Sequence, residues 1–471
     1  MFIGPGYGSV GVNFMSGKAP RVVLVWCAAL SLGQARSLPQ AQAPEKGPHR
    51  PISFFIYADS SIAEHGDGAV RAQFQEFVDH LGNRSRYGSL GIALNYPYLT
   101  YVTGRGPASF AIDAVEMKRY EANVRVAHEM GLPVVVGFND GPWFSPGGSF
   151  YAYWKTTDGG GFLARYKDGE VNESLRSKGS LTKEELEPFL GINLYDVKRS
   201  QDALLLTLSP YATRYRRARL RVLGLALAEW QRIDRTYPGT IQAFTTDSEV
   251  CDFSFRSVPS GDALPVGYEK SMTEPFCRRY GIADCGAFFR NRQFTYQSPE
   301  ERHWFDFRAE AHRKFVSDTV SAIRKRFPST VIYTHQLGTL DEKLVLDYRR
   351  QDFASPQRTA FVDGSIPGVT ANVYFGRDAD FRELVSQISE KAGGRGWALA
   401  EFNPGKNWPG SRVELSLFSF DLLRFLADHN VSIITLLAWQ SNELDAGIKD
   451  SGVDDAVKRF LAEGPDAGNA R

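Results

Sequence analysis

The sequence carries almost no net charge and has little that would bind a phosphate or a metal. Lys and Arg number 55 and Asp and Glu 54 in 471 residues, a formal net charge of +1. Nucleic acids and acidic membranes gain no bulk electrostatic attraction from such a chain, so we expect no nucleic-acid partner. The stretch after the first predicted strand, "YADSSIAEHGDG", is not a phosphate-binding glycine fingerprint. No cluster of two or three His residues occurs at the predicted strand ends, and we expect neither a metal nor an organic cofactor.

Cysteine is scarce, with four residues in the whole chain. Cys27 lies in an N-terminal segment that we expect to be removed, which leaves Cys251, Cys277 and Cys285. An oxidising compartment would allow these three thiols to form one disulfide and leave one thiol over. Cys277 and Cys285 would close the shortest loop, but the sequence does not choose the pairing. The spacing does not match a zinc site.

Apolar runs long enough to span a bilayer comfortably are missing as well. The strongest apolar run, residues 22–32, follows the basic Lys18 and Arg21 and precedes small residues near Ala35. This order is typical of a secretory signal peptide. We therefore predict that residues 1–43 are signal peptide and linker. The protein is expected to be secreted or periplasmic, without stable membrane insertion after cleavage; a retained membrane anchor is the alternative.

From residue 51 onward, strand and helix patterns alternate eight times. The predicted strands are continuous apolar runs, as in a parallel sheet that is buried on both faces. Eight such units favour an α/β fold, a (β/α)8 TIM barrel with enlarged βα loops, over residues 51–464, with 465–471 as a disordered tail. A doubly wound open sheet is the alternative. The predicted strands cover residues 52–57, 89–96, 132–138, 240–246, 330–335, 368–375, 396–402 and 431–439. The predicted helices cover residues 70–81, 111–130, 212–233, 300–327, 342–350, 380–393, 412–429 and 454–463.

The C-terminal ends of these strands carry acids, amides and aromatic rings. In a (β/α)8 barrel the loops that leave these ends build the active site. Carboxylates and amides bind hydroxyl groups, and Trp and Tyr rings pack on sugar rings, so the set predicts a carbohydrate site. The candidate substrate-binding residues are Asp59, Asn95, Asn139, Asp140, Trp143, Asp247, His335, Tyr374, Asn403 and Trp439.

Two glutamates are the candidate catalytic residues. Glu401, in "WALAEFNPG", directly follows an apolar run, where a carboxylate is costly in a core but natural at a barrel mouth. Glu249, in "TTDSEV", follows the fourth strand and is its predicted partner. Carboxyls about 5–5.5 Å apart suit a retaining glycosidase, and about 6.5–9.5 Å an inverting one. Asp247 could replace or support Glu249, and Glu249 could instead pair with Arg256.

A Glu ending strand four, a Glu ending strand seven and a Trp ending strand eight resemble the pattern of the "4/7" retaining glycoside hydrolases (clan GH-A). The resemblance spans about residues 51–464 as architecture, with motifs of only a few residues each. It implies that Glu249 is the acid/base and Glu401 the nucleophile. It also implies that Tyr374, in "TANVYF", hydrogen-bonds the nucleophile, and that Trp439, in "LLAWQS", floors the subsite of the cleaved sugar.

Two positions depart from that pattern. Ser248 stands where the clan usually has an Asn that holds the sugar 2-hydroxyl. The second strand ends in Asn95 and Tyr96, where an Arg commonly lies near the nucleophile. With these departures, the sequence assigns no family within the clan.

Several candidates also have a plainer structural interpretation. Asp59 and Asp140 lie next to turn-forming Ser or Gly and could be caps or turn residues. Tyr374 and Trp439 could pack at the strand ends. His335 could be structural, bind substrate or shuttle a proton.

Two longer stretches also carry predictions. The aromatic, glycine-rich loop after the third strand is either a wall of the substrate cleft or a lid packed on the barrel. The basic stretch "RYRRARLRV" (214–222) predicts a solvated helix face.

The sequence thus predicts a secreted glycoside hydrolase that cleaves O-glycosidic bonds of an oligo- or polysaccharide by a retaining double displacement. Two alternatives stay open. One is a non-catalytic carbohydrate-binding barrel, in which one carboxylate is out of reach. The other is a metal-dependent barrel hydrolase that uses Asp247, Asp252 and His335.

Overall fold

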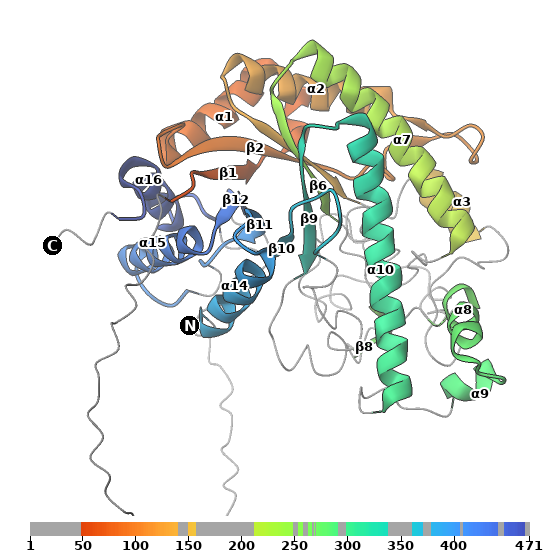
Figure 1. The fold of residues 1–471 in the computed structure, drawn as a ribbon. Helices are drawn as coiled ribbons and strands as arrows, with labels where there is room; N and C mark the ends of the chain where they lie inside the picture. Colours follow the sequence, from red (N-terminus) through yellow and green to blue (C-terminus); the bar gives the residue numbers. More distant parts are fainter. Residues whose placement is uncertain are drawn as a thin grey trace, which may run out of the picture. The chain divides into compact units, whose positions relative to one another are not determined.

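Eight parallel strands close into a barrel (Figure 1). Around the barrel, each strand pairs with the strands before and after it in the chain, and the last strand pairs with the first. This arrangement confirms the predicted (β/α)8 fold. The barrel strands are β1 (Ile52–Tyr57), β2 (Gly88–Tyr96), β5 (Val134–Asn139), β6 (Ile241–Asp247), β9 (Val331–Leu337), β10 (Gly368–Thr370), β11 (Trp397–Phe402) and β12 (Val431–Leu436).

Helices cover the outside of the barrel, and most follow the predicted ranges (Figure 1). The helix predicted at residues 342–350 lies outside the described part of the chain. The helices between successive barrel strands, and after the last one, include α1 (Asp67–Leu81), α2 (Ala114–Glu129), α7 (Thr213–Thr236), α10 (Pro299–Arg326), α14 (Asp378–Ala392), α15 (Arg412–Asp428) and α16 (Val453–Glu463).

The loops at the strand ends contain further small elements that the sequence pattern did not predict. Such insertions fit the expectation of enlarged βα loops. They are the 3-10 helix η1 (Ser60–His65), the strand pair β3 (Val102–Thr103) and β4 (Ala111–Ile112), the helix α3 (Ser149–Thr156), the strand pair β7 (Phe253–Ser257) and β8 (Asp262–Pro265), and the helices α8 (Lys270–Tyr280) and α9 (Cys285–Arg290).

The computed structural model describes the chain in separate segments. Pro48–Arg471 form one unit, whereas the predicted signal peptide and linker (1–43) lie outside the described residues. Two residues of the predicted tail continue the described turn after α16: Pro465 is buried, and Asp466 lies 3.8 Å from the His49 ring. The described residues are 49–139, 149–156, 212–247, 253–257, 262–265, 268, 270–290, 298–337, 360–370, 378–405, 408–440 and 447–466.

Local sequence fixes where two of the covering helices begin. The carboxylate of Asp113 accepts hydrogen bonds from the backbone N–H groups of Val115 and Glu116, which begins α2. Ser411 and Glu414 form a reciprocal capping box at the start of α15. These side chains satisfy N–H groups that have no partner within the helix, and each cap typically contributes about 1 kcal/mol.

The interior of the barrel is filled by a small apolar cluster. Its four alanines leave room for two aromatic rings, Phe55 and Tyr333. The Tyr333 hydroxyl lies 3.3 Å from Thr435 Oγ1 on β12. Gly91 is required beside this cluster, because a Cβ there would lie 2.7 Å from the Phe55 ring. The cluster consists of Phe55, Ala93, Val135, Ala243, Tyr333, Ala398, Ala400 and Ile433.

A larger apolar layer lies between the strands and the covering helices. It contains the fully buried indoles of Trp230 on α7 and Trp397 on β11. Trp397 also donates its Nε1–H to the backbone oxygen of His429, at 2.8 Å. Burying one such large side chain stabilises the fold by roughly 2–3 kcal/mol.

The basic stretch of α7 is only partly solvated, which corrects the prediction for one residue. Arg219 is 1% exposed and donates to Thr319 Oγ1 of α10 at 2.6 Å. Its guanidinium carbon lies 3.7 Å from the centre of the Phe315 ring. Arg216 of α7 forms an ion pair with Asp318 of α10. These contacts join α7 to α10, which lie beside each other in Figure 1.

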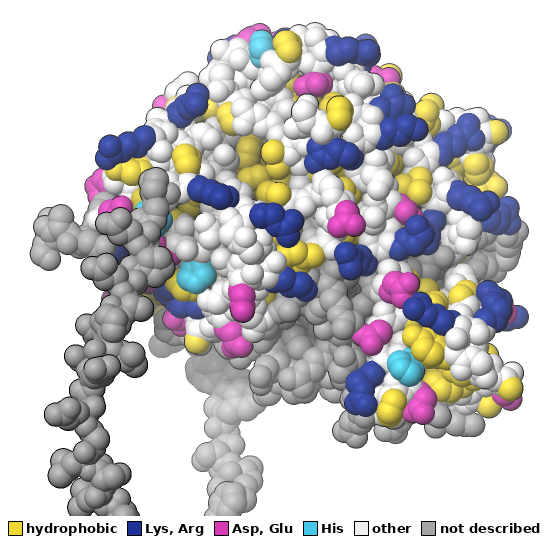
Figure 2. Space-filling model, viewed as in Figure 1, with side chains coloured by type: hydrophobic (Ala, Val, Ile, Leu, Met, Phe, Trp, Pro, Cys, Tyr) yellow, Lys and Arg dark blue, Asp and Glu magenta, His cyan; other side chains and the backbone are white. Residues whose placement is uncertain are grey.

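Charged side chains of both signs are spread over the face of the molecule that Figure 2 shows. Figure 2 shows Lys and Arg interspersed with Asp and Glu and separated by uncharged side chains. This surface is the spatial counterpart of the balanced composition. None of the helices in the described part of the chain has the length and apolar character that a bilayer crossing needs.

A disulfide joins Cys277 of α8 to Cys285 of α9, with a Cα–Cα distance of 5.7 Å. The structure thus selects the shortest loop among the pairings that the sequence left open. Phe276, Phe289 and Trp304 pack around the disulfide. The remaining candidate, Cys251, lies outside the described residues.

Candidate active site

The C-terminal strand ends bring several predicted residues into register. Asn139 of β5 pairs with Asp247 of β6, and Asp247 pairs with His335 of β9. Because side chains alternate along a strand, Asn139 and His335 face the same way as the interior residues Val135 and Tyr333. Both are 1% exposed. The ends of these three strands therefore lie side by side at the barrel mouth.

A bulge in β11 sets the position of Glu401. Between Leu399 and Phe402, β11 contains one residue more than either neighbouring strand. Leu399 and Phe402 both belong to the outer apolar layer, whereas Ala400 belongs to the barrel interior. A bulge re-aims the side chain beside it. Glu401 consequently lies at the mouth, with its side chain 17% exposed.

Glu401 and His335 come together at this mouth. The Nε2 atom of His335 lies 3.7 Å from Oε1 of Glu401. The two residues belong to β9 and β11, which are separated by β10. This contact joins the candidate nucleophile to a titratable ring.

Polar atoms line the same face of the other strands. Asn95 lies two residues after the interior Ala93, and Thr245 lies two after Ala243. Thr370 is in register with Glu401. The Asn95 Oδ1, Thr245 Oγ1 and Thr370 Oγ1 atoms are buried, and none has a hydrogen-bond partner among the described residues. Sequence reasoning missed the two threonines, although the two-residue period of each strand would have indicated them.

Tyr96 faces the opposite way from its neighbour Asn95. Its ring is fully buried among Tyr101, Tyr120, Phe138 and Trp230, outside the barrel. Burial raises the pKa of the Tyr96 phenol. Of the two residues that end the second strand, only Asn95 is thus placed toward the candidate site.

Asp59 and Asn403 serve local turns. Asp59 accepts hydrogen bonds from the backbone N–H and the hydroxyl of Ser61 and caps η1. The Asn403 side-chain oxygen accepts the backbone N–H of Gly405 at 3.1 Å. The sequence left open whether Asp59 is a cap, and the structure shows that it is one. Ligand contact by Asp59 or Asn403 stays a prediction.

Trp439 packs against α1. Its indole is 6% exposed, and its ring centre lies 5.1 Å from that of Phe77 and 5.3 Å from that of His80. Its Nε1–H donates to Glu76 Oε1 at 3.3 Å. These contacts match the packing interpretation, and the predicted role as a sugar platform stays a prediction.

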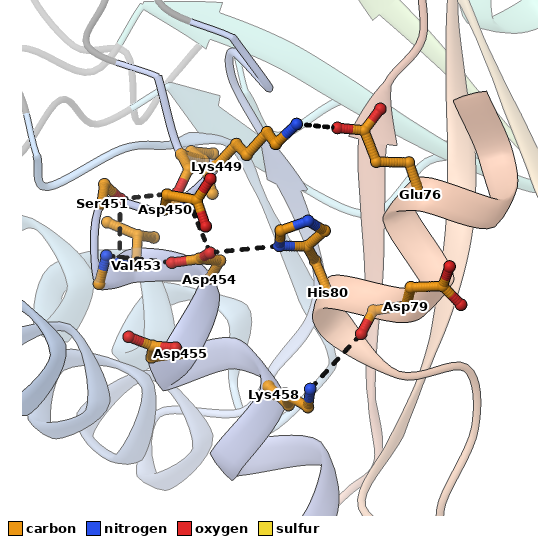
Figure 3. A network of polar contacts seen from close by, with 12 residues as sticks. Glu76, Asp79, His80, Lys449, Asp450, Ser451, Val453, Asp454, Asp455 and Lys458 are labelled. Carbon is orange, nitrogen blue, oxygen red and sulfur yellow. Dashed lines mark hydrogen bonds and ion pairs between the residues drawn. The ribbon is translucent and has the colours of Figure 1, made fainter. Parts of the chain in front are cut away.

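Residues 449–458, which follow Trp439 in the sequence, also contact α1 (Figure 3). Lys449 forms an ion pair with Glu76. The Lys449 ammonium, hydrogen-bonded to Glu76, lowers the pKa of that carboxyl below its ordinary value, and the Trp439 hydrogen bond acts in the same direction. Further along, Asp454 lies 3.7 Å from the His80 ring. Figure 3 shows these residues bridging α1 and the start of α16.

His80, Asp450 and Asp454 place their ligand atoms within 4.8 Å of one another. Asp454 is 2% exposed and accepts the backbone N–H groups of Asp450 and Gly452. The guanidinium of Arg412 lies 3.8 Å from Asp454 and already supplies positive charge. We interpret this group as a structural cluster that holds the start of α16.

The described part of the loop after β5 is packed rather than open. In α3, Phe150 is fully buried and Trp154 is 3% exposed. Their rings contact Tyr215 of α7 and, for Phe150, Phe110. Phe150 and Trp154 of α3 thus pack on neighbouring elements, as the packed alternative expects.

Several predicted residues lie outside the described part of the chain. They include the proposed acid/base Glu249. For Asp247 only the backbone position is described. The residues named in the sequence analysis that lie outside the described part of the chain are Asp140, Trp143, Ser248, Glu249, Asp252 and Tyr374.

Comparison with known proteins supports the fold. No model of a known protein family matches the sequence, and no curated protein matches it. Among solved structures, the catalytic domain of β-amylase from Paenibacillus polymyxa is similar, with a TM-score of 0.56 and 12% identity over 88% of this chain and 98% of that one. The β-galactosidases from Rahnella sp. R3 and Bacillus circulans sp. alkalophilus give TM-scores of 0.52 and 0.51 at 11% and 10% identity. Each comparison covers 89% of this chain and 56% of the galactosidase. These structures are glycoside hydrolases, as the sequence resemblance implies, and at such identities the likeness shows a common (β/α)8 fold.

Proposed function

We propose that this protein is a glycoside hydrolase that cleaves O-glycosidic bonds of an oligo- or polysaccharide. The observation that carries the proposal is the position of Glu401. Its carboxylate lies beside a bulge at the C-terminal end of β11, partly exposed, at the mouth where (β/α)8 enzymes hold their active sites. The fold that the chain shares with a β-amylase and two β-galactosidases supports the same class of reaction.

The proposed mechanism is a retaining double displacement. Glu401 attacks the anomeric carbon, and the new carbon–oxygen bond replaces the bond to the leaving group. Glu249 gives its proton to the leaving oxygen. Glu249 then takes a proton from a water molecule, which attacks the same carbon and releases Glu401. These steps need no metal and no organic cofactor.

Buried polar atoms around the mouth support a sugar as the ligand. Asn95, Thr245 and Thr370 each carry a buried oxygen on the inward face without a hydrogen-bond partner among the described residues. Such atoms are costly unless a ligand or water satisfies them. Sugar hydroxyls both donate and accept hydrogen bonds and would satisfy them.

Export to the periplasm or the medium is part of the proposal. It is supported by the signal-like N-terminal pattern, with Lys18 and Arg21 before an apolar run. The Cys277–Cys285 disulfide suits an oxidising compartment.

A screen of aryl glycosides and polysaccharides tests the function. We expect the wild type to cleave at least one of them, with a bell-shaped dependence of rate on pH. Glu401→Gln should lower kcat by on the order of 10³-fold or more while leaving the protein folded, because it removes the nucleophile.

Glu390→Gln is the matched control, since Glu390 is exposed on α14. It should cleave the same substrates at the wild-type rate. Equal activity of Glu401→Gln and the wild type would rule out the assignment.

A further inference from the structure

We infer that His335 is a positioning residue that holds the Glu401 carboxylate from behind, on the side away from the ligand. Its catalytic consequence rests on the proposed function, because it takes Glu401 to be the nucleophile. The contact itself is independent of that function: His335 Nε2 lies 3.7 Å from Glu401 Oε1.

The difference in exposure between the two side chains indicates which of them a ligand can reach. The His335 side chain is 1% exposed and the Glu401 side chain 17%. A ligand in the barrel mouth can therefore touch Glu401 directly, whereas it reaches His335 only if neighbouring side chains move. Burial favours a role for His335 behind the carboxylate over the substrate-binding role that the sequence predicts.

Strand topology explains how residues on non-adjacent strands meet. β10 lies between β9 and β11, and its last described residue, Thr370, pairs with Leu337 on one side and Glu401 on the other. β10 is thus the single strand that separates the two residues. The bulge in β11 turns the Glu401 side chain toward the mouth, where it meets His335.

The chemistry of an imidazole suits this place. At 3.7 Å the contact is longer than a hydrogen bond and acts electrostatically. An imidazole N–H beside a carboxylate favours its ionised form, which Glu401 needs before it attacks. When Glu401 bonds to the anomeric carbon its charge disappears, and when water releases it the charge returns. His335 takes no part in proton transfer in either step.

Other residues lie on the strand of His335 and on further strands of the barrel. Asp247 of β6 is in register with it, and Tyr333 precedes it by two residues on the same face of β9. Three places along the barrel from β9, β2 presents the neutral amide of Asn95 on its inward face. A test must therefore isolate the effect of Glu401 from that of its neighbours.

The direct test is an NMR titration of His335 in the full chain with labelled histidine, its signal assigned by its loss in His335→Gln. We expect the titration midpoint to fall by about half a pH unit or more in Glu401→Gln, because the neighbouring charge is removed. Glu390→Gln should leave it unchanged. A midpoint that is the same in Glu401→Gln and the wild type, or a His335 that does not titrate, would overturn the inference whether or not the protein cleaves glycosides.

Kinetics test the catalytic consequence on a substrate from the screen. His335→Gln keeps an N–H donor near the position of Nε2, whereas His335→Ala does not. We expect kcat to fall about 10-fold for the Gln variant and about 100-fold for the Ala variant, because the carboxylate is misplaced, with KM within about threefold. A rise in KM at unchanged kcat would indicate a substrate-binding role and contradict the inference. If no glycoside is cleaved, the proposed function fails while the titration still decides the contact.

Discussion

Arg219 shows how a charged side chain can stabilise this fold from inside it. Its guanidinium is buried between α7 and α10, stacked on Phe315 and hydrogen-bonded to Thr319. A planar guanidinium tolerates such a site better than an ammonium does, because it stacks on rings and is more weakly hydrated. The surrounding arginines of the same stretch point to solvent or to surface acids, so charge alone does not distinguish Arg219 in the sequence.

We predict that Arg219→Ala lowers the free energy of unfolding by about 2–3 kcal/mol, through the lost stacking and hydrogen bond. Arg217→Ala is the matched control, because Arg217 is exposed on the same helix and should tolerate the change. Urea unfolding of both variants measures the difference. Equal stability of the two variants would show that the buried contacts of Arg219 contribute nothing.

At the same scale, Glu401 illustrates what a single sequence can and cannot predict. The apolar run before it predicted a carboxylate at the end of the seventh strand. Its contact with His335 was not predictable, because it depends on one extra residue in β11 and on the short intervening β10. The partner of Trp439 was equally hidden: Glu76 lies 363 residues earlier in the chain, and only the closure of the barrel brings α1 beside it.

Among the elements, α1 and the segment after β12 are joined by Glu76. It accepts hydrogen bonds from Lys449 and from the Trp439 indole, and its side chain is 30% exposed. Trp439 and Lys449 also pair through their backbones, since Lys449 N–H donates to the Trp439 oxygen at 3.0 Å. One carboxylate thus anchors both ends of the loop that leaves the eighth strand.

We predict that Glu76→Gln lowers the free energy of unfolding by about 1 kcal/mol at pH 7. Because Lys449 lowers the pKa of Glu76 below its ordinary 4.5, this contribution is fully present above pH 4.5. It is lost as the pH falls through the lower pKa of the folded state. The stability difference between wild type and variant should therefore be constant from neutral pH to about pH 5 and shrink below pH 4.5.

Urea unfolding at pH 7, 5, 4 and 3 checks this dependence. Glu310→Gln removes an exposed ion pair with Arg279 and should change stability less. A difference that grows on acidification would contradict the assignment of Glu76 as the anchor.

For the whole molecule, the alternating pattern of strands and helices was sufficient to predict the fold. Every barrel strand lies within two residues of its predicted start, since parallel strands buried on both faces are apolar throughout. The polar residues of the candidate site were predicted less completely than the fold. Asn95, Asn139, His335 and Glu401 reach the mouth, whereas Asp59 caps a turn, and Thr245 and Thr370 were missed. Strand ends identify the rim, but only register and bulges decide which side chains face inward.

In the proposed retaining mechanism, Glu401 forms a covalent bond to the sugar. The most direct measurement is mass spectrometry of the full chain, followed by peptide mapping, after reaction with a 2-deoxy-2-fluoro glycoside of a sugar that the screen identifies, carrying an activated leaving group. The fluorine slows both steps of a retaining mechanism, and the activated leaving group restores the first step, so the covalent intermediate accumulates. We predict one added glycosyl mass on the peptide that contains Glu401, and none in Glu401→Gln. An adduct on another residue, or no adduct on an enzyme that turns over the parent glycoside, would contradict it.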